Sequence, residues 1–173
     1  MRSLKVLVLE DSPFQLMAIH QMLNACGVFD VLTAESVDSA CQSLHKRGAV
    51  DVAICDLHMD GPDGLDLIRH LGINDLAQAL VVCSSAAPEA IAEAVQLARE
   101  QNVPVLGALP KPATANAIHE LLSEYLEPAC HEGQLPLAEV SEIGSLDSTV
   151  PDHVYKVCAA WQARQSVKDG PDA

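Results

Sequence analysis

The chain has 173 residues, of which 49% are apolar and only 3% aromatic, and its formal net charge is −14. This length suits one domain with an appendage, and the apolar share excludes a chain that lacks a packed core. So negative a surface repels duplex DNA and anionic membranes, and we expect no nucleic acid and no membrane as direct partners. The N-terminal apolar run is too short for a signal peptide, and no run reaches the length of a membrane span, so we expect a cytoplasmic protein.

Short apolar runs alternate with segments of helical period through residue 127. The run at 4–9 predicts a strand, and Ser12-Pro13 then predicts the start of a helix that Gly27 stops. A second strand is expected at 28–34, followed by a helix from Ser36 to Gly48. The remaining strands are expected at 50–55, 80–83 and 103–109, each followed by a further helical segment. Of these segments, the first follows a Gly/Pro loop at 61–64, the second opens at Pro88, and the third is capped by Thr114.

Five such repeats predict one fold. Short strands that alternate with helices favour a parallel sheet covered by helices on both faces. Right-handed crossovers then give a flavodoxin-like, doubly wound α/β fold of the (β/α)5 kind. Ligands of this fold bind at the carboxyl ends of the strands, so the chemistry is expected at that edge.

Beyond the repeats the composition changes. Residues 128–150 contain scattered Pro, Gly and acids, which is typical of a linker. In 151–173, Val154, Val157, Cys158 and Trp161 recur at helical spacing and predict a short amphipathic helix. Trp161 would anchor this helix, either on its own domain or across a homodimer. We therefore expect a domain at 1–127, a linker at 128–150, and a C-terminal helix and tail at 151–173.

Chemistry-bearing residues coincide with the predicted strand ends. Glu10 and Asp11 end the first strand, Asp56 follows the third, Ser84 ends the fourth, and Lys111 follows the fifth. Acids that converge on one crevice repel each other unless a hard cation with oxygen ligands is bound, and Mg²⁺ suits carboxylates that also receive a phosphate. A carboxylate such as Asp56 can accept a phosphoryl group covalently, with Lys111 as a point charge and the Ser84 hydroxyl as a donor to the phosphate.

This arrangement resembles the receiver domain of two-component response regulators. The resemblance covers about residues 4–127 and rests on four segments in order: VLVLEDSPFQ, ICDLHMDGPDGLDLIR, VVCSS and LPKP. It implies that Glu10 and Asp11 are the acidic pair, Asp56 the phospho-acceptor, Ser84 the switch hydroxyl, and Lys111 the paired lysine. The family's third metal ligand, a backbone carbonyl, would fall on His58. Phosphoryl groups would come from a sensor histidine kinase or a phosphotransfer protein, and the signal would leave through a downstream protein partner.

Two positions depart from the family pattern. Asp60 stands where the family usually has proline, and Ala108 stands at the aromatic switch position. An aromatic rotamer therefore cannot report phosphorylation, and a backbone or helix shift is expected to do so. The switch hydroxyl is assigned to Ser84, with Ser85 as the alternative register.

A narrower resemblance links the chain to receivers of EAL-type cyclic-di-GMP phosphodiesterases. The chain lacks an E-A-L motif, so that activity is not expected of it.

Two other functions stay open. A receiver-like adaptor that is never phosphorylated is one, and a small phosphatase with Asp56 as nucleophile is the other. The phosphatase would want a second acid two residues after Asp56, where His58 stands. We expect a signalling module and not an enzyme, apart from its own slow dephosphorylation. Free thiols are expected in the core at Cys26, Cys41, Cys55 and Cys83.

Overall fold

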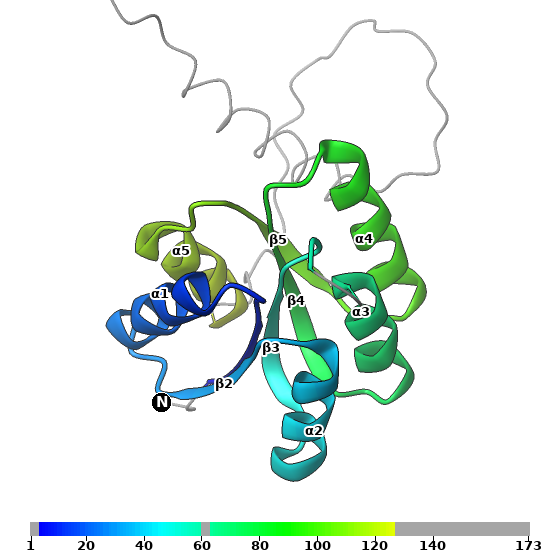
Figure 1. Cartoon of the computed structure of the whole chain (residues 1–173), viewed down its shortest axis with the longest axis horizontal. Helices are drawn as coiled ribbons and strands as arrows, with labels where there is room; N and C mark the ends of the chain where they lie inside the picture. Colours follow the sequence, from blue (N-terminus) through cyan, green and yellow to red (C-terminus); the bar gives the residue numbers. More distant parts are fainter. Residues whose placement is uncertain (1–3, 60–62, 127–173) are drawn as a thin grey trace, which may run out of the picture.

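A computed structural model describes residues 4–59 and 63–126 of the chain. Strands and helices alternate strictly through this part (Figure 1). In chain order the elements are β1 (Lys5–Leu9), α1 (Pro13–Ala25), β2 (Asp30–Ala34), α2 (Val37–Arg47), β3 (Val50–Cys55), α3 (Gly64–Ile73), β4 (Ala77–Ser84), α4 (Pro88–Glu100), β5 (Val105–Pro110) and α5 (Ala115–Leu126).

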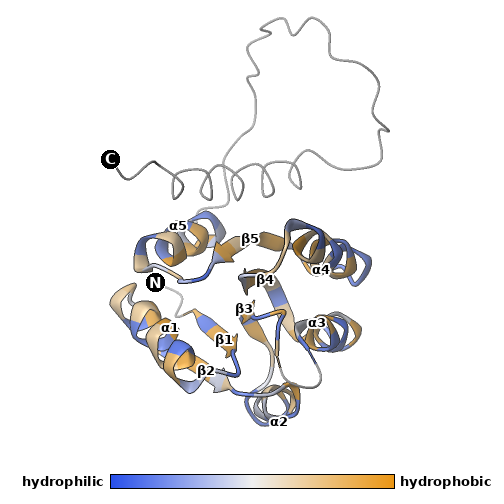
Figure 2. Cartoon of the chain, turned by 45° about the horizontal axis from the view of Figure 1, so that its top comes forward, coloured by the Kyte–Doolittle hydropathy of each residue, from blue (hydrophilic) through white to orange (hydrophobic). Residues whose placement is uncertain are grey.

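The strands form one parallel sheet in the order β2-β1-β3-β4-β5. This is the flavodoxin-like doubly wound order, so the predicted fold class is confirmed. Helices α1 and α5 cover one face of the sheet, and α2, α3 and α4 cover the other (Figure 2).

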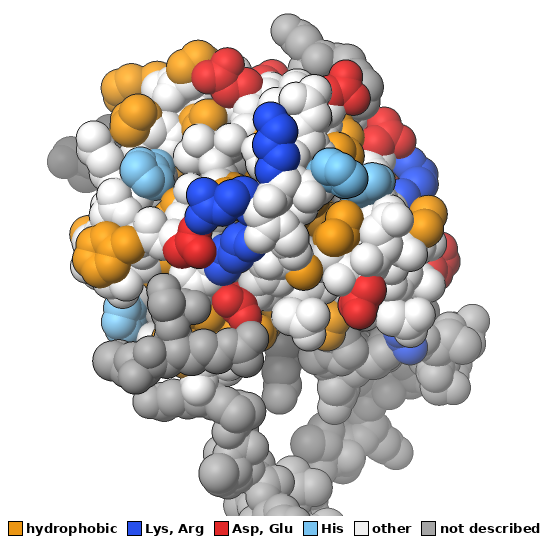
Figure 3. Space-filling view, turned by 90° about the horizontal axis from the view of Figure 1, so that it is seen from below, with side chains coloured by type: hydrophobic (Ala, Val, Ile, Leu, Met, Phe, Trp, Pro, Cys, Tyr) orange, Lys and Arg blue, Asp and Glu red, His pale blue; other side chains and the backbone are white. Residues whose placement is uncertain are grey.

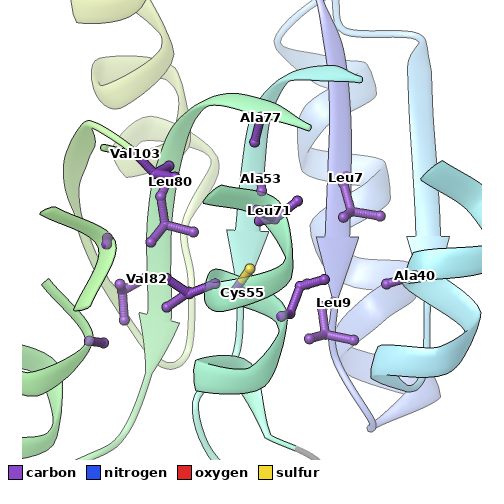
Figure 4. Close-up of a cluster of buried hydrophobic side chains, with 14 of the residues drawn as sticks. Leu7, Leu9, Ala40, Ala53, Cys55, Leu71, Ala77, Leu80, Val82 and Val103 are labelled. Atoms are coloured by element: carbon purple, nitrogen blue, oxygen red, sulfur yellow. The ribbon is translucent and has the colours of Figure 1, made fainter. Parts of the chain in front are cut away.

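Successive side chains of each central strand enter different cores. Leu7 and Leu9 of β1 pack in the core beneath α2, α3 and α4 (Figure 4), whereas Val6 and Val8 pack beneath α1 and α5. This period of two places apolar side chains on both faces, which is why the strand sequences are continuous apolar runs. Two helix layers therefore hold the carboxyl edge of the sheet in a fixed geometry.

Helix ends largely agree with the sequence signals. Ser36 caps α2 by accepting a hydrogen bond from the backbone N–H of Ser39, and the Ser39 side chain reciprocates. Gly27 and Gly48 have φ values of +81° and +77°, which glycine adopts without strain. Ser12 is at the N-cap position of α1, but its side chain makes no capping hydrogen bond.

The element bounds differ from the sequence expectation in four places. Strand β4 begins at Ala77, because 77–79 pair with β3, although the Ala-Gln-Ala segment carries no apolar run. Strand β2 begins at Asp30 and β5 at Val105, two residues later than expected. Gly64, expected in the loop, is the first residue of α3, with Asp63 as its N-cap.

The predicted linker at 128–150 and the helix at 151–173 lie outside the described residues. Within 4–59 and 63–126, no helix is both long enough and apolar enough to cross a membrane.

Candidate functional site

The predicted site residues lie together at the carboxyl edge of the sheet. Glu10 follows β1, Asp56 follows β3, Ser84 ends β4 and Lys111 follows β5. Backbone hydrogen bonds fix the first two, because Glu10 N–H donates to Ala34 O and Asp56 N–H donates to Leu9 O, each at 3.0 Å. The acids are therefore positioned by the parallel register of three neighbouring strands.

Three carboxylates converge at this edge. Glu10, Asp11 and Asp56 each offer an oxygen, and these oxygens lie within 4.8 Å of one another. Glu10 and Asp56 are almost completely buried, with exposed fractions of 1% and 3%. Asp11 is more exposed than either, so the cluster opens toward solvent on the side of Asp11.

Lys111 bridges the two buried acids. Its Nζ lies 2.6 Å from Glu10 Oε2 and 2.6 Å from Asp56 Oδ2. Burial raises the pKa of Glu10 above its ordinary value, although Lys111 opposes this. Burial lowers the pKa of Lys111, but its hydrogen bonds to Asp56 and Glu10 outweigh that effect and leave the pKa raised. Lys111 thus remains a cation between the two acids.

The side chains fit a divalent cation. The three carboxylates and the one ammonium of this cluster have a summed charge of −2. The donors are all oxygens, which is the ligand type that Mg²⁺ prefers. A Mg²⁺ ion held by Glu10, Asp11 and Asp56 would balance that charge.

The loop after β3 closes tightly around Asp56. The backbone N–H of His58 donates to Asp56 Oδ1 at 3.1 Å, and the imidazole of His58 is exposed. The His58 side chain is therefore directed to solvent, which agrees with a role for its backbone alone. Asp60 lies outside the described residues.

Gly64 is a site-forming residue that sequence reasoning did not identify. A Cβ at this position would collide with the carbonyl oxygen of Asp56. The Asp63 carboxylate caps α3 by accepting from the N–H groups of Leu65 and Asp66. An Asp directly before a helical apolar pattern is a capping signal, and it could have placed the helix start at Gly64.

Ser84 and Ser85 differ in environment. Ser84 is 1% exposed, and its Oγ accepts from the N–H of Ala86 at 3.0 Å. Ser85 is exposed and lines a cavity beside Lys111. The assignment of the switch hydroxyl to Ser84 stays a prediction. Ala108, at the position of the family's aromatic switch, is a partly buried residue of β5.

The four described cysteines are free thiols. Cys55 and Cys83 are buried, as expected, whereas Cys26 and Cys41 are only partly buried. Burial raises the pKa of Cys83 to about 12 and that of Cys55 further still. Both of these buried thiols therefore stay protonated at neutral pH and act as small apolar side chains.

A doubly wound fold with an acidic cluster at the carboxyl edge of its sheet is typical of two-component signalling domains, and comparison with known proteins agrees. Residues 6–123 match the response regulator receiver domain family, and the chain belongs to that family. Membership agrees with the prediction of a two-component signalling module that is not an enzyme, apart from loss of its own phosphoryl group.

Individual relatives cover the same region. Cyclic di-GMP phosphodiesterase RocR of Pseudomonas aeruginosa is 34% identical over 125 residues, which span 72% of this chain but 32% of RocR. The chain thus matches about a third of RocR, and the predicted likeness to receivers of such phosphodiesterases is confirmed. Chemotaxis protein CheY-3 of Vibrio cholerae is 26% identical over 73% of this chain and 94% of its own length.

Solved structures show the same fold. A response regulator receiver protein from Pseudomonas putida aligns with a TM-score of 0.59 at 26% identity, over 72% of this chain and 98% of its own. A signal receiver domain of an HD domain-containing protein from Pseudomonas fluorescens aligns with a TM-score of 0.63 at 20% identity, over 73% and 97%.

Proposed function

We propose that residues 1–127 accept a phosphoryl group on Asp56 from a sensor histidine kinase or a phosphotransfer protein in the cytoplasm. The observation that carries this proposal is the buried bridge of Lys111 between Glu10 and Asp56 at the carboxyl edge. A charged cluster this deeply buried is costly, and such clusters concentrate at functional sites.

Each side chain has a defined role in the transfer. A carboxylate oxygen of Asp56 attacks the phosphorus of a phosphohistidine whose other ring nitrogen is protonated, an O–P bond forms, the donor's N–P bond breaks, and the histidine leaves as a neutral imidazole. The Lys111 ammonium, which has three N–H donors, pairs with a phosphoryl oxygen once Asp56 has become an acyl phosphate. The Ser84 hydroxyl donates to another oxygen after rotating from its hydrogen bond with Ala86.

Glu10, Asp11, Asp56 and the His58 carbonyl are the proposed Mg²⁺ ligands. When bound, Mg²⁺ neutralises charge on the incoming phosphoryl group. The linker 128–150 and segment 151–173 would then connect the domain to its output, which runs through contacts with a downstream protein.

The experiment is incubation of the full chain with Mg²⁺ and acetyl phosphate, followed by intact-mass measurement. We expect a mass gain of one phosphoryl group that is lost in Asp56→Ala and retained in Asp30→Ala, a partly exposed acid at the opposite edge. Absence of any gain at saturating donor would favour the adaptor, and rapid multiple turnover would favour the phosphatase. A gain that persists in Asp56→Ala would place the acceptor elsewhere.

A further inference from the structure

Helix α1 differs in charge from the other helices of the described part. Its sequence, PFQLMAIHQMLNA, contains no Asp, Glu, Lys or Arg, and His20 is its one ionisable side chain. Each of α2, α3, α4 and α5 carries at least two charged residues besides histidine. A surface helix normally has a charged outer face, and a helix that lacks one is normally covered.

The exposed side of α1 carries large apolar side chains beside uncharged polar ones such as Gln15 and Gln21. Phe14 is 84% exposed and Met17 is 55% exposed, which is unusual for large apolar side chains so close together. Phe14 also lines a cavity of about 380 Å³ between α1 and the segment after β5. The walls of this cavity are formed by Ala18, Ile19 and Met22 of α1 and by Pro112 and Ala113. Lys111 and Ser85 also line it, and Lys111 contacts Glu10 and Asp56 of the carboxylate site.

We propose that the C-terminal segment of the same chain occupies this groove, with Trp161 in the cavity beside Phe14. Val154, Val157, Cys158 and Trp161 are spaced so that one helical face would carry all four. That predicted face matches the groove in chemistry, because most of the side chains that line the groove are apolar. The predicted helix lies outside the described residues, so its apolar face is inferred from the sequence, whereas the groove is observed in the structure.

The connection is long enough for this docking. Helix α5 packs beside α1, and 27 residues separate Leu126 from Val154. A linker of that length spans roughly 30 Å on average, whereas α1 is about 20 Å long. Tethering at this distance gives an effective concentration in the millimolar range, so even weak apolar contacts suffice.

The test uses Trp161, the single tryptophan of the chain, as a fluorescent reporter in the full-length protein without a phosphodonor. We expect a blue-shifted emission in the wild type and a red shift in Phe14→Glu, with at least a twofold rise in the acrylamide quenching constant. A glutamate in the first turn favours the helix, so Phe14→Glu should still fold, and circular dichroism checks this. The matched control is Phe29→Glu, since Phe29 is 76% exposed but lies beyond the far end of α1.

Three results would overturn the proposal. Emission typical of exposed tryptophan in the wild type would mean that the groove is not filled by this segment. A shift in Phe29→Glu without one in Phe14→Glu would place the segment elsewhere. A blue shift that disappears on dilution would assign the groove to the segment of a second copy. None of these readouts depends on phosphorylation, so a failed phosphoryl transfer would leave the docking test intact.

Discussion

The ion pairs at the two edges of the sheet differ in burial. At the carboxyl edge, Glu10 and Asp56 are buried and share the ammonium of Lys111. At the other edge, Arg47 pairs with Asp30 while their side chains remain 57% and 39% exposed. Lys5 there donates to the backbone carbonyls of Arg47 and Gly48. Figure 3 shows Lys and Arg side chains gathered in one patch with acidic side chains beside them.

The difference in burial indicates which charges affect stability and which are kept for function. Exposed ion pairs contribute little because water screens them, whereas buried charges cost free energy unless they are fully paired. The exposed Arg47–Asp30 pair at the amino edge should therefore contribute little to folding. The carboxyl edge holds an energetically unfavourable cluster, which is the expected cost of a site that must bind a cation and a phosphoryl group.

The largest expected effect is from Gly64→Ala. The added Cβ would meet the Asp56 carbonyl oxygen, and backbone on both sides prevents relief. We expect a loss of about 3 kcal/mol in the free energy of unfolding, measured by urea denaturation. Gly27→Ala is the control at the other edge, where nothing lies within 4 Å and only the positive φ is strained, so about 1 kcal/mol should be lost. Equal losses would show that the close approach at Asp56 is unimportant.

The next effect is from Lys111→Met. Removal of the ammonium leaves Glu10 and Asp56 facing each other with no cation, and we expect a loss of about 2 kcal/mol at neutral pH. The loss is limited because one acid can take up a proton, so it should shrink as the pH falls. Saturating Mg²⁺ should restore part of the stability. Lys46→Met, at an exposed position, should change the free energy of unfolding by less than about 0.5 kcal/mol.

The sequence predicted the fold well because its strands are buried on both faces. Continuous apolar runs marked β1 and β3 within one residue, since nearly every position of these strands enters a core. The start of β4 was missed because Ala77, Gln78 and Ala79 become a strand only through pairing with β3. Tertiary pairing of this kind leaves no local signal.

The sequence identified residues that form the site, but not the contacts between their side chains. Residues that follow parallel strands must share one edge, so the sequence placed Glu10, Asp56 and Lys111 together. It could not show that Lys111 contacts both acids, because that depends on how side chains extend across the crevice. Nor could it show Gly64 against Asp56, since that approach arises where α3 begins.

A smaller effect of opposite sign is expected from Glu10→Gln. Burial raises the pKa of Glu10 above its ordinary value of 4.5, so folding disfavours the ionised form. Wild-type stability is therefore lost as the pH rises through the interval between the ordinary and the raised pKa. Without metal at pH 7, the variant should be more stable by about 1 kcal/mol, and the difference should vanish near pH 4. Glu35→Gln, at an exposed position, is the control and should change the free energy of unfolding at pH 7 by less than about 0.5 kcal/mol. A destabilised Glu10→Gln variant at pH 7 would mean that the contact with Lys111 outweighs burial.

The smallest effect is expected from Arg47→Ala at the amino edge. Its 2.8 Å contact with Asp30 joins two exposed side chains, so the pair should contribute less than about 0.5 kcal/mol, and less again at high salt. Arg69→Ala is the matched control, because Arg69 pairs with Asp66 at 3.0 Å with similar exposure. Thermal denaturation at low and high ionic strength measures both variants. Arg47→Ala and Lys111→Met could instead lower the free energy of unfolding equally. Burial would then not distinguish the two edges, and the stabilities would give no reason to place the functional site at the carboxyl edge.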